Sequence, residues 1–209
     1  MSDVAAAVEA VRARIERAGG DPDAITIVGA KPPDVAACRA AIAAGIVDLG
    51  ENRAQELAAK APEVDGARWH FIGRLQTNKV RSIVEHVALW ESLDRVEALD
   101  AVASRAPGAE VLVQVNISGE VQKGGCEPSS TAGLVHHATA VGLRVAGLMG
   151  IGPLGDPEAA RPGFRTLRGL ADELGLDVRS MGMTSDLEVA VQEGATMVRI
   201  GTALFGPRR

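Results

Sequence analysis

The sequence contains four lysines, and their positions indicate which of them could do covalent chemistry. Lys31 lies two residues after the end of the apolar run 25–29, where a strand would deliver a side chain to the end of a sheet. A lysine whose pKa is lowered by desolvation and nearby positive charge can attack an aldehyde and form a Schiff base. The alternative for Lys31 is an ordinary loop lysine. Lys60 falls late in a helical pattern and is expected to be a solvated surface charge, while Lys79 and Lys123 fall in or just after loops.

Two turns in the last part of the chain have residue types that suit an anion. The first turn, 183–188, contains Ser185 and Glu188 at the spacing of a capping box, which predicts that a helix starts there. In the second turn, Gly201 allows the backbone to approach a ligand closely, and Thr202 can open a short helix. Helix N-termini present unpaired N–H groups and a partial positive charge, which suit a phosphate. The alternative is that both turns are ordinary helix caps.

Arg199 lies within an apolar run, where burying an arginine is costly unless it is paired. One interpretation is a structural ion pair. The other is a hydrogen bond to the pyridine nitrogen of a cofactor, which would keep that nitrogen unprotonated and weaken the ring as an electron sink. His70 is interpreted as a hydrogen-bonded core residue. Cys38 and Cys126 lie far apart without metal-ligand spacing, so we expect two reduced thiols and no metal site.

The elements that must position these residues follow a regular alternation. Eight short apolar runs alternate with stretches of helical periodicity, which implies a parallel sheet with right-handed crossovers. The apolar runs are residues 25–29, 46–49, 69–72, 87–90, 111–116, 143–149, 178–181 and 197–200. The helical stretches include 35–44, 54–60, 95–104, 159–174 and 187–193, preceded by an amphipathic segment with Val4, Val8, Val11 and Ile15 on one stripe.

Eight strands are the number that closes a (β/α)₈ TIM barrel, and 209 residues lie near the short end of that fold. The alternative is an open doubly wound sheet, which usually carries a Gly-rich turn after its first strand. Here that turn reads GAKPP (29–33), so we predict the α/β barrel. In such a barrel the functional groups come from the C-terminal ends of the strands, and phosphate often binds after strands seven and eight.

Composition limits the class of protein. Apolar residues make up 46% and charged residues 23% of the chain, so we expect a full core in one domain, residues 1–209. A net charge of −5 without a Lys/Arg block argues against nucleic acid or an anionic membrane as the main partner. No apolar run approaches the roughly 18 residues of a membrane span, and the N-terminal segment is charged throughout, unlike a signal peptide. We therefore expect a cytoplasmic protein.

Several longer stretches resemble the pyridoxal phosphate homeostasis proteins, which are single-domain relatives of the N-terminal barrel of alanine racemase. The resemblance runs nearly end to end. It rests on GEN (50–52), HFIGRLQTNK (70–79), QVN (114–116) with Glu120 and Lys123, GLM (147–149), SMGMTSD (180–186) and VRIGTALFG (198–206). It implies an alanine racemase N-terminal-domain-like barrel that holds pyridoxal 5′-phosphate as an aldimine on the lysine that ends strand one. Counted back from Gly50 without a gap, that lysine is Lys31.

The resemblance also implies which other residues bind the cofactor. Phosphate contacts would fall on Ser185, Gly201 and Thr202. The contact with the pyridine nitrogen would fall on Arg199. The further cofactor-binding residues, from the matching stretches, are Asn52 and Met149.

One departure concerns the neighbours of this lysine. The family usually has Ser or Thr before it and Thr after it, whereas here the neighbours of Lys31 are Ala30 and Pro32. The changed turn supports an alternative hypothesis, in which the barrel has an impaired cofactor site and acts through protein contacts.

The function implied by the resemblance is to buffer pyridoxal phosphate and deliver it to pyridoxal-phosphate-dependent apo-enzymes. A second hypothesis is a weak amino-acid racemase. Two-base racemisation needs a proton donor on each face of the α-carbon, and alanine racemase takes one of them from a tyrosine of a second domain. This sequence has no tyrosine and reaches Arg209 directly after the last barrel segment, so an efficient racemase is not expected. No exposed apolar helix demands a partner, and we expect a monomer.

Overall fold

The computed structural model describes residues 3–207 and contains a closed barrel of eight parallel strands in chain order. The strands are β1 (Thr26–Ala30), β2 (Asp48–Glu51), β3 (Arg68–Phe71), β4 (Val87–Leu93), β5 (Glu110–Val115), β6 (Arg144–Gly150), β7 (Val178–Ser180) and β8 (Met197–Ile200). Each strand overlaps one of the eight predicted apolar runs, so the predicted barrel is confirmed. Residues 1–2 and 208–209 of the predicted domain, Arg209 included, lie outside the described residues.

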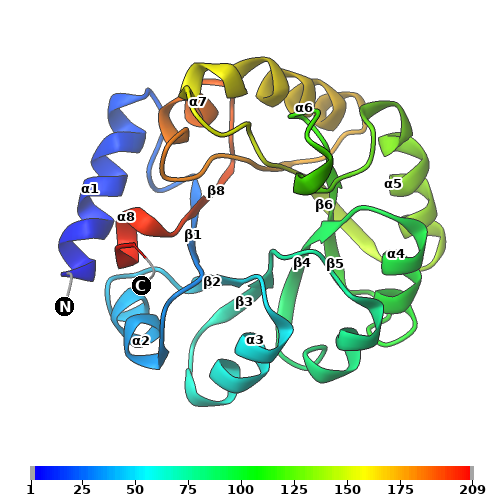
Figure 1. The fold of residues 1–209 in the computed structure, drawn as a ribbon, viewed down its shortest axis with the longest axis horizontal. Coiled ribbons are helices and arrows are strands. Elements are labelled where there is room, and N and C mark those ends of the chain that lie inside the picture. Colours follow the sequence, from blue (N-terminus) through cyan, green and yellow to red (C-terminus); the bar gives the residue numbers. More distant parts are fainter. Residues whose placement is uncertain (1–2, 208–209) are drawn as a thin grey trace.

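Helices form a ring around the strands (Figure 1). They are α1 (Val4–Arg17), α2 (Val35–Ala43), α3 (Ala54–Lys60), α4 (Val96–Ala103), α5 (Thr131–Ala140), α6 (Arg161–Glu173), α7 (Leu187–Gln192) and α8 (Thr202–Phe205). Short 3₁₀ helices cover Ala61–Glu63, Thr77–Ser82, Val121–Lys123, Pro128–Ser130 and Pro157–Ala160, and the second of these connects β3 to β4. The first and last helices, α1 and α8, lie side by side outside the junction of β1 and β8 (Figure 1).

Alternation along β8 decides which residues face the inside of the barrel. Val198 and Ile200 pack in the large apolar cluster that includes residues of the helices. Because successive side chains of a strand point to opposite faces, Arg199 between them faces the barrel interior. β8 closes the barrel by pairing with β1, with Val28 opposite Arg199.

A second, smaller apolar cluster fills part of the interior. Its buried members come from five different strands and none comes from a helix, as expected for side chains enclosed by the barrel. They are Val28, Leu89, Leu112, Met149 and Met197. The polar residues described below occupy the same interior, so the barrel has a mixed core.

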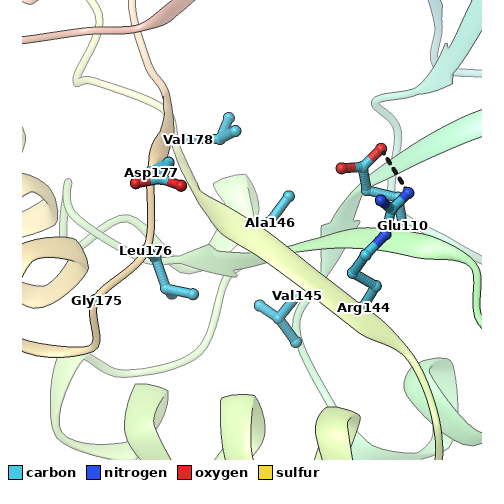
Figure 2. Close-up of a pocket in the computed structure, with 8 residues that line it drawn as sticks. All are labelled: Glu110, Arg144, Val145, Ala146, Gly175, Leu176, Asp177 and Val178. Atoms are coloured by element: carbon cyan, nitrogen blue, oxygen red, sulfur yellow. Dashed lines mark ion pairs between the residues drawn. The ribbon is translucent and has the colours of Figure 1, made fainter.

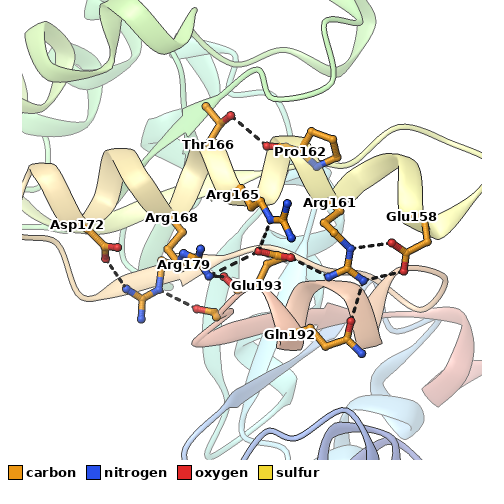
Figure 3. A network of polar contacts seen from close by, with 11 residues as sticks. Glu158, Arg161, Pro162, Arg165, Thr166, Arg168, Asp172, Arg179, Gln192 and Glu193 are labelled. Carbon is orange, nitrogen blue, oxygen red and sulfur yellow. Dashed lines mark hydrogen bonds and ion pairs between the residues drawn. The ribbon is translucent and has the colours of Figure 1, made fainter.

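A network of ion pairs joins α6 to the end of α7 on the outside of the barrel (Figure 3). Arg161 and Arg165 lie 2.7 and 3.1 Å from opposite carboxylate oxygens of Glu193. Arg168 lies 3.6 Å from the same carboxylate and also donates to the Glu193 carbonyl. Only 5% of the Glu193 side chain is exposed, whereas Arg165 and Arg168 are 61% and 41% exposed. The three arginines therefore cover the carboxylate and hold α7 against α6.

The remaining expectations from composition concern membranes, metals and thiols. Within residues 3–207, the helices are too short or too polar to cross a membrane. The same residues contain no group of three or more His, Cys, Asp or Glu that could hold a metal ion. Cys38 and Cys126 are buried free thiols, and burial raises the pKa of Cys38 to about 11. The Cys38 thiol is therefore protonated and a weak nucleophile at neutral pH.

Candidate functional site

Lys31 occupies a strained turn at the C-terminal end of β1. Its φ of 55° makes it the only non-glycine residue with a positive φ in the described part of the chain. Residues other than glycine rarely adopt this backbone conformation, and such strain is concentrated at functional sites. The Lys31 N–H donates to the Gly50 carbonyl at 2.7 Å, which attaches the turn to the end of β2, and the side chain is exposed. A lysine is thus presented at the rim of the barrel by a backbone held in a demanding conformation.

Lys60 corrects one of the expectations from sequence. It was predicted to be a solvated surface charge, but only 8% of the residue is exposed. Its Nζ donates to Glu51 at 2.5 Å, to the Pro32 carbonyl at 2.6 Å and to Glu56 at 3.2 Å. The prediction was wrong because α3 turns its last residue inward, toward the fully buried Glu51 at the end of β2. A buried carboxylate needs such a partner.

Arg199 lies inside the barrel and is 4% exposed. It donates to the Ser180 hydroxyl at 2.6 Å and to the Gly150 carbonyl at 2.7 Å, and one carboxylate oxygen of Glu91 lies 3.9 Å away. Burial lowers the pKa of Arg199, while Glu91 opposes that shift. The first of the two interpretations of Arg199, a structural ion pair, is therefore observed, and the contact with a cofactor stays a prediction. The two hydrogen bonds of Arg199 use two of the five guanidinium N–H donors, so the ion pair does not preclude a contact with a ligand.

His70 connects the Arg199 partners to β2. Its Nδ1 lies 2.7 Å from Glu91 and its Nε2 lies 3.0 Å from Asp48. Burial disfavours the charged ring, but the hydrogen bonds to Asp48 and Glu91 outweigh burial and raise the pKa of His70 to about 9. Burial likewise disfavours the Glu91 carboxylate, but His70 and Arg199 hold its pKa below the ordinary value. The prediction that His70 is a hydrogen-bonded core residue is confirmed, and its ring is positively charged at neutral pH.

The turn after β7 differs from its predicted capping box. α7 begins at Leu187 with Asp186 at its N-cap, and no side chain caps its first N–H groups. Asp186 instead accepts from the Met183 N–H at 2.6 Å, and Glu188 binds Arg14 of α1 at 2.6 and 2.7 Å. The predicted pairing of Ser185 with Glu188 is therefore wrong, because a two-pronged bond to an arginine is stronger than a backbone cap. Ser185 remains in the turn, with its side chain exposed.

The loops after β7, β8 and β1 meet at one place on the rim. Gly201 precedes α8, which opens at Thr202 as predicted. The Ala203 N–H donates to the Thr184 hydroxyl at 3.3 Å, which joins the loop after β8 to the loop after β7. A Cβ added at Gly201 would lie 3.0 Å from the Ala30 carbonyl oxygen, so the backbone here packs closely against the end of β1. The structure thus brings the Lys31 turn and both predicted anion-binding turns together.

Asn52 and Met149 complete the set of predicted cofactor-binding residues. Asn52 is exposed in the loop after β2, and its N–H donates to Glu51 at 3.2 Å. Met149 is 1% exposed and packs in the interior cluster with Val28. Its β6 position lies opposite Ser180 of β7, the hydroxyl that binds Arg199. Met149 is therefore a residue of the barrel interior, and Asn52 is a residue of the rim.

Sequence reasoning missed several polar residues of this arrangement, among them Glu91 and Lys60. β4 was predicted to end at residue 90, but it continues to Leu93 and carries Glu91 into the interior. A carboxylate just after an apolar run was the available signal, because a buried Arg199 requires an acidic partner. For Lys60, the available signal was Glu51 at the end of the second strand. A carboxylate that is buried there requires a cation, and the lysine on the following helix could supply it.

A separate pocket of about 300 Å³ lies at the opposite end of the barrel (Figure 2). It is formed where β5, β6 and β7 begin, and the ion pair between Arg144 and Glu110, at 3.3 Å, lies on its rim. Leu176, Val145 and Val178 line its wall. The predicted site residues lie at the other end of the strands, so this pocket is distinct from the candidate site.

A family model and two solved structures define the class of barrel. A family model described as the alanine racemase N-terminal domain matches residues 5–209. PipY of Synechococcus elongatus, solved with PLP bound, is 32% identical with a TM-score of 0.84 over 97% of this chain and 100% of its own. An alanine racemase from Clostridium difficile is 14% identical with a TM-score of 0.76 over 96% of this chain and 56% of its own, a likeness of fold alone. The fold is that of the N-terminal barrel of alanine racemase.

Sequence relatives then narrow the family. A protein of Aquifex aeolicus is 42% identical over 97% of this chain and 95% of its own length. A protein of Pseudomonas aeruginosa is 42% identical over 100% of this chain and 97% of its own. Both are named pyridoxal phosphate homeostasis protein. This chain belongs to the family of pyridoxal phosphate homeostasis proteins.

Proposed function

We propose that this chain binds pyridoxal 5′-phosphate covalently on Lys31, and that it buffers the cofactor in the cytoplasm and delivers it to apo-enzymes. The observation that carries the proposal is the left-handed backbone of Lys31 at the end of β1. Backbone strain of this kind costs free energy, persists only where the surrounding structure enforces it, and is concentrated at functional sites. Support also comes from the relatives, which are named for pyridoxal phosphate homeostasis, and from PipY, which was solved with the cofactor bound.

The residues around Lys31 fit a phosphorylated pyridine aldehyde. When bound, this cofactor supplies an aldehyde that condenses with a lysine amine and releases water. Lys31 would provide the amine. The Ser185 hydroxyl and the backbone N–H groups of Gly201 and Thr202 would hold the phosphate, next to the end of β1 that Gly201 approaches.

Arg199 would donate a hydrogen bond to the ring nitrogen of the cofactor. Asn52, on the rim, and Met149, in the barrel interior, would also contact the cofactor. An arginine keeps its proton even where burial lowers its pKa. It therefore donates a hydrogen bond without protonating the ring nitrogen, and the ring withdraws electrons less strongly. Such a site favours retention of the cofactor over turnover of amino acids.

A carrier role agrees with the other properties of the chain. The relatives are named as homeostasis proteins and not as enzymes, and the sequence offers no tyrosine for a second proton donor. The exposed rim around Lys31 supports transfer, because an acceptor protein can approach it directly. We propose that residues 1–209 form one domain that acts as a monomer.

Covalent mapping tests the proposal directly. The purified protein would be mixed with pyridoxal phosphate, reduced with borohydride and analysed by mass spectrometry. We expect one adduct, on Lys31, which disappears in Lys31→Ala and persists in the control Lys79→Ala. No adduct, or adducts spread over Lys60, Lys79 and Lys123, would contradict the proposal. Chiral analysis of alanine incubated with the loaded protein should show no exchange above the free cofactor.

A further inference from the structure

Lys60 contacts the Lys31 turn, defined here as residues 30–33, and also the end of β2 to which that turn is bonded. Its ammonium carries three N–H donors, and its three acceptors are Pro32, Glu51 and Glu56. The Pro32 carbonyl belongs to the residue after Lys31. Glu51 follows Gly50, whose carbonyl accepts the Lys31 N–H. Lys31 is therefore bracketed by bonds on both sides, one from β2 and one from Lys60.

The two prolines of the Lys31 turn limit the backbone hydrogen bonds that the turn can make. Pro32 and Pro33 lack an N–H, so neither can donate a backbone hydrogen bond. A residue that precedes proline is also restricted toward extended conformations, which a φ of 55° at Lys31 contradicts. The strained conformation has to be maintained by neighbouring elements. The buried ammonium of Lys60 donates to the carbonyl of Pro32 and is one such neighbour.

We propose that Lys60 is a positioning residue for the covalent site, an inference that rests on the proposed function of Lys31. Lys60 holds the Pro32 carbonyl, and Glu51 neutralises the ammonium in the protein interior. The bond fixes the backbone from which the Lys31 amine extends. The chain thereby maintains the turn with Ala30 and Pro32 at the two positions beside the lysine.

A simpler role for Lys60 would be to neutralise Glu51, which is fully buried. A buried ammonium needs acceptors for all three of its N–H donors, so the bond to the Pro32 carbonyl, at 2.6 Å, is compatible with either role. The two roles differ in a variant that lacks both charges. Lys60→Met leaves Glu51 buried without its ammonium, but the double variant Glu51→Gln/Lys60→Met removes the charge problem and still lacks the donor to Pro32.

Amide exchange and cofactor titration would be measured on the full chain of the wild type and the double variant. The Lys31 N–H reports on the turn, and the Thr26 N–H, bound to the Thr196 carbonyl, reports on the other end of β1. We expect the double variant to fold, with about tenfold faster exchange at Lys31 and unchanged exchange at Thr26. The affinity for pyridoxal phosphate should fall about tenfold, as when one molecule in ten has the competent turn. Arg161→Met, which removes an arginine from Glu193 on the outer face, is the matched control and should leave Lys31 exchange unchanged.

The outcomes separate this inference from the proposed function. Wild-type exchange at Lys31 and wild-type affinity in the double variant would mean that Lys60 is only a counter-ion, and would overturn the inference while leaving the Lys31 site intact. If the wild type forms no Lys31 adduct, the proposed function fails. Exchange still decides the role of Lys60 in that case, because faster Lys31 exchange in the double variant supports positioning and unchanged exchange refutes it.

Discussion

Two clusters of charged residues in this molecule have similar chemistry and opposite surroundings. One lies inside the barrel and joins five strands. The other joins α6 to its neighbours on the outside, where Arg165 and Arg168 are 61% and 41% exposed (Figure 3). The inner cluster comprises Asp48, His70, Glu91, Ser180 and Arg199, and the outer cluster comprises Glu158, Arg161, Arg165, Arg168 and Glu193.

The difference between the clusters lies in what happens when a partner is removed. Inside the barrel, Arg199 and His70 have no exposed position to move to, so each depends on Glu91. Outside, the guanidinium groups of Arg165 and Arg168 are already partly hydrated and need no replacement partner. The inner cluster therefore ties the geometry of Arg199 to the stability of the barrel, whereas the outer cluster is a helix clamp.

Removing one carboxylate from each cluster should give the largest contrast. Glu91→Gln leaves two buried cations without their shared anion, and we expect it to lower the free energy of unfolding by about 3–5 kcal/mol. Glu193→Gln should lower it by about 1 kcal/mol or less, because the arginines can turn to water. Urea denaturation of both variants measures the difference. Equal losses would mean that the inner cluster is not held by charge.

The pH dependence of stability should come mainly from the inner cluster. The pKa of His70 is raised from its ordinary value of 6.5 to about 9, so the folded state binds its proton more tightly than the unfolded state. The stabilisation is complete below about pH 6.5 and is lost as the pH rises through about 9. We expect the free energy of unfolding to fall by about 3 kcal/mol across this window.

Denaturation at a series of pH values would test this assignment to His70. His70→Gln should abolish the slope between about pH 6.5 and 9. His137→Gln, which removes a histidine paired with Asp100 on the surface, should retain it. A slope that survives in His70→Gln would assign the titration to another group.

The two clusters also mark how far the sequence alone could lead. The barrel can be predicted from the period and number of the apolar runs, which are local properties of the sequence. The position of Lys31 at the rim can be predicted from the end of the first run. Lys60 and Glu91 were missed because their burial depends on which helix face and which strand length the packing selects. The capping box at Ser185 failed for a related reason, since Arg14, 174 residues from Glu188 in the chain, takes the carboxylate that a local pattern assigns to the cap.

The bond between Arg14 and Glu188 is intermediate between the two clusters. The side chains are 24% and 42% exposed, and Arg14 also donates to the Thr184 carbonyl at 2.8 Å. We expect Arg14→Met to lower the free energy of unfolding by about 1 kcal/mol. Its specific effect should be faster amide exchange in residues 183–188 and several-fold weaker binding of pyridoxal phosphate, because Ser185 lies in this turn. A uniform increase in exchange across the barrel would instead indicate general destabilisation.

The smallest effect is expected for Arg165→Met in the outer cluster. Arg165 is 61% exposed and shares Glu193 with two other arginines, so its loss should change the free energy of unfolding by less than about 0.5 kcal/mol. Because exposed charges are screened, that difference should disappear in about 1 M salt. The loss in Glu91→Gln should persist there, since salt does not reach the barrel interior. Parallel urea denaturation at low and high salt therefore separates a clamp held by surface charge from a cluster held by burial, and a salt-sensitive Glu91→Gln would remove that distinction.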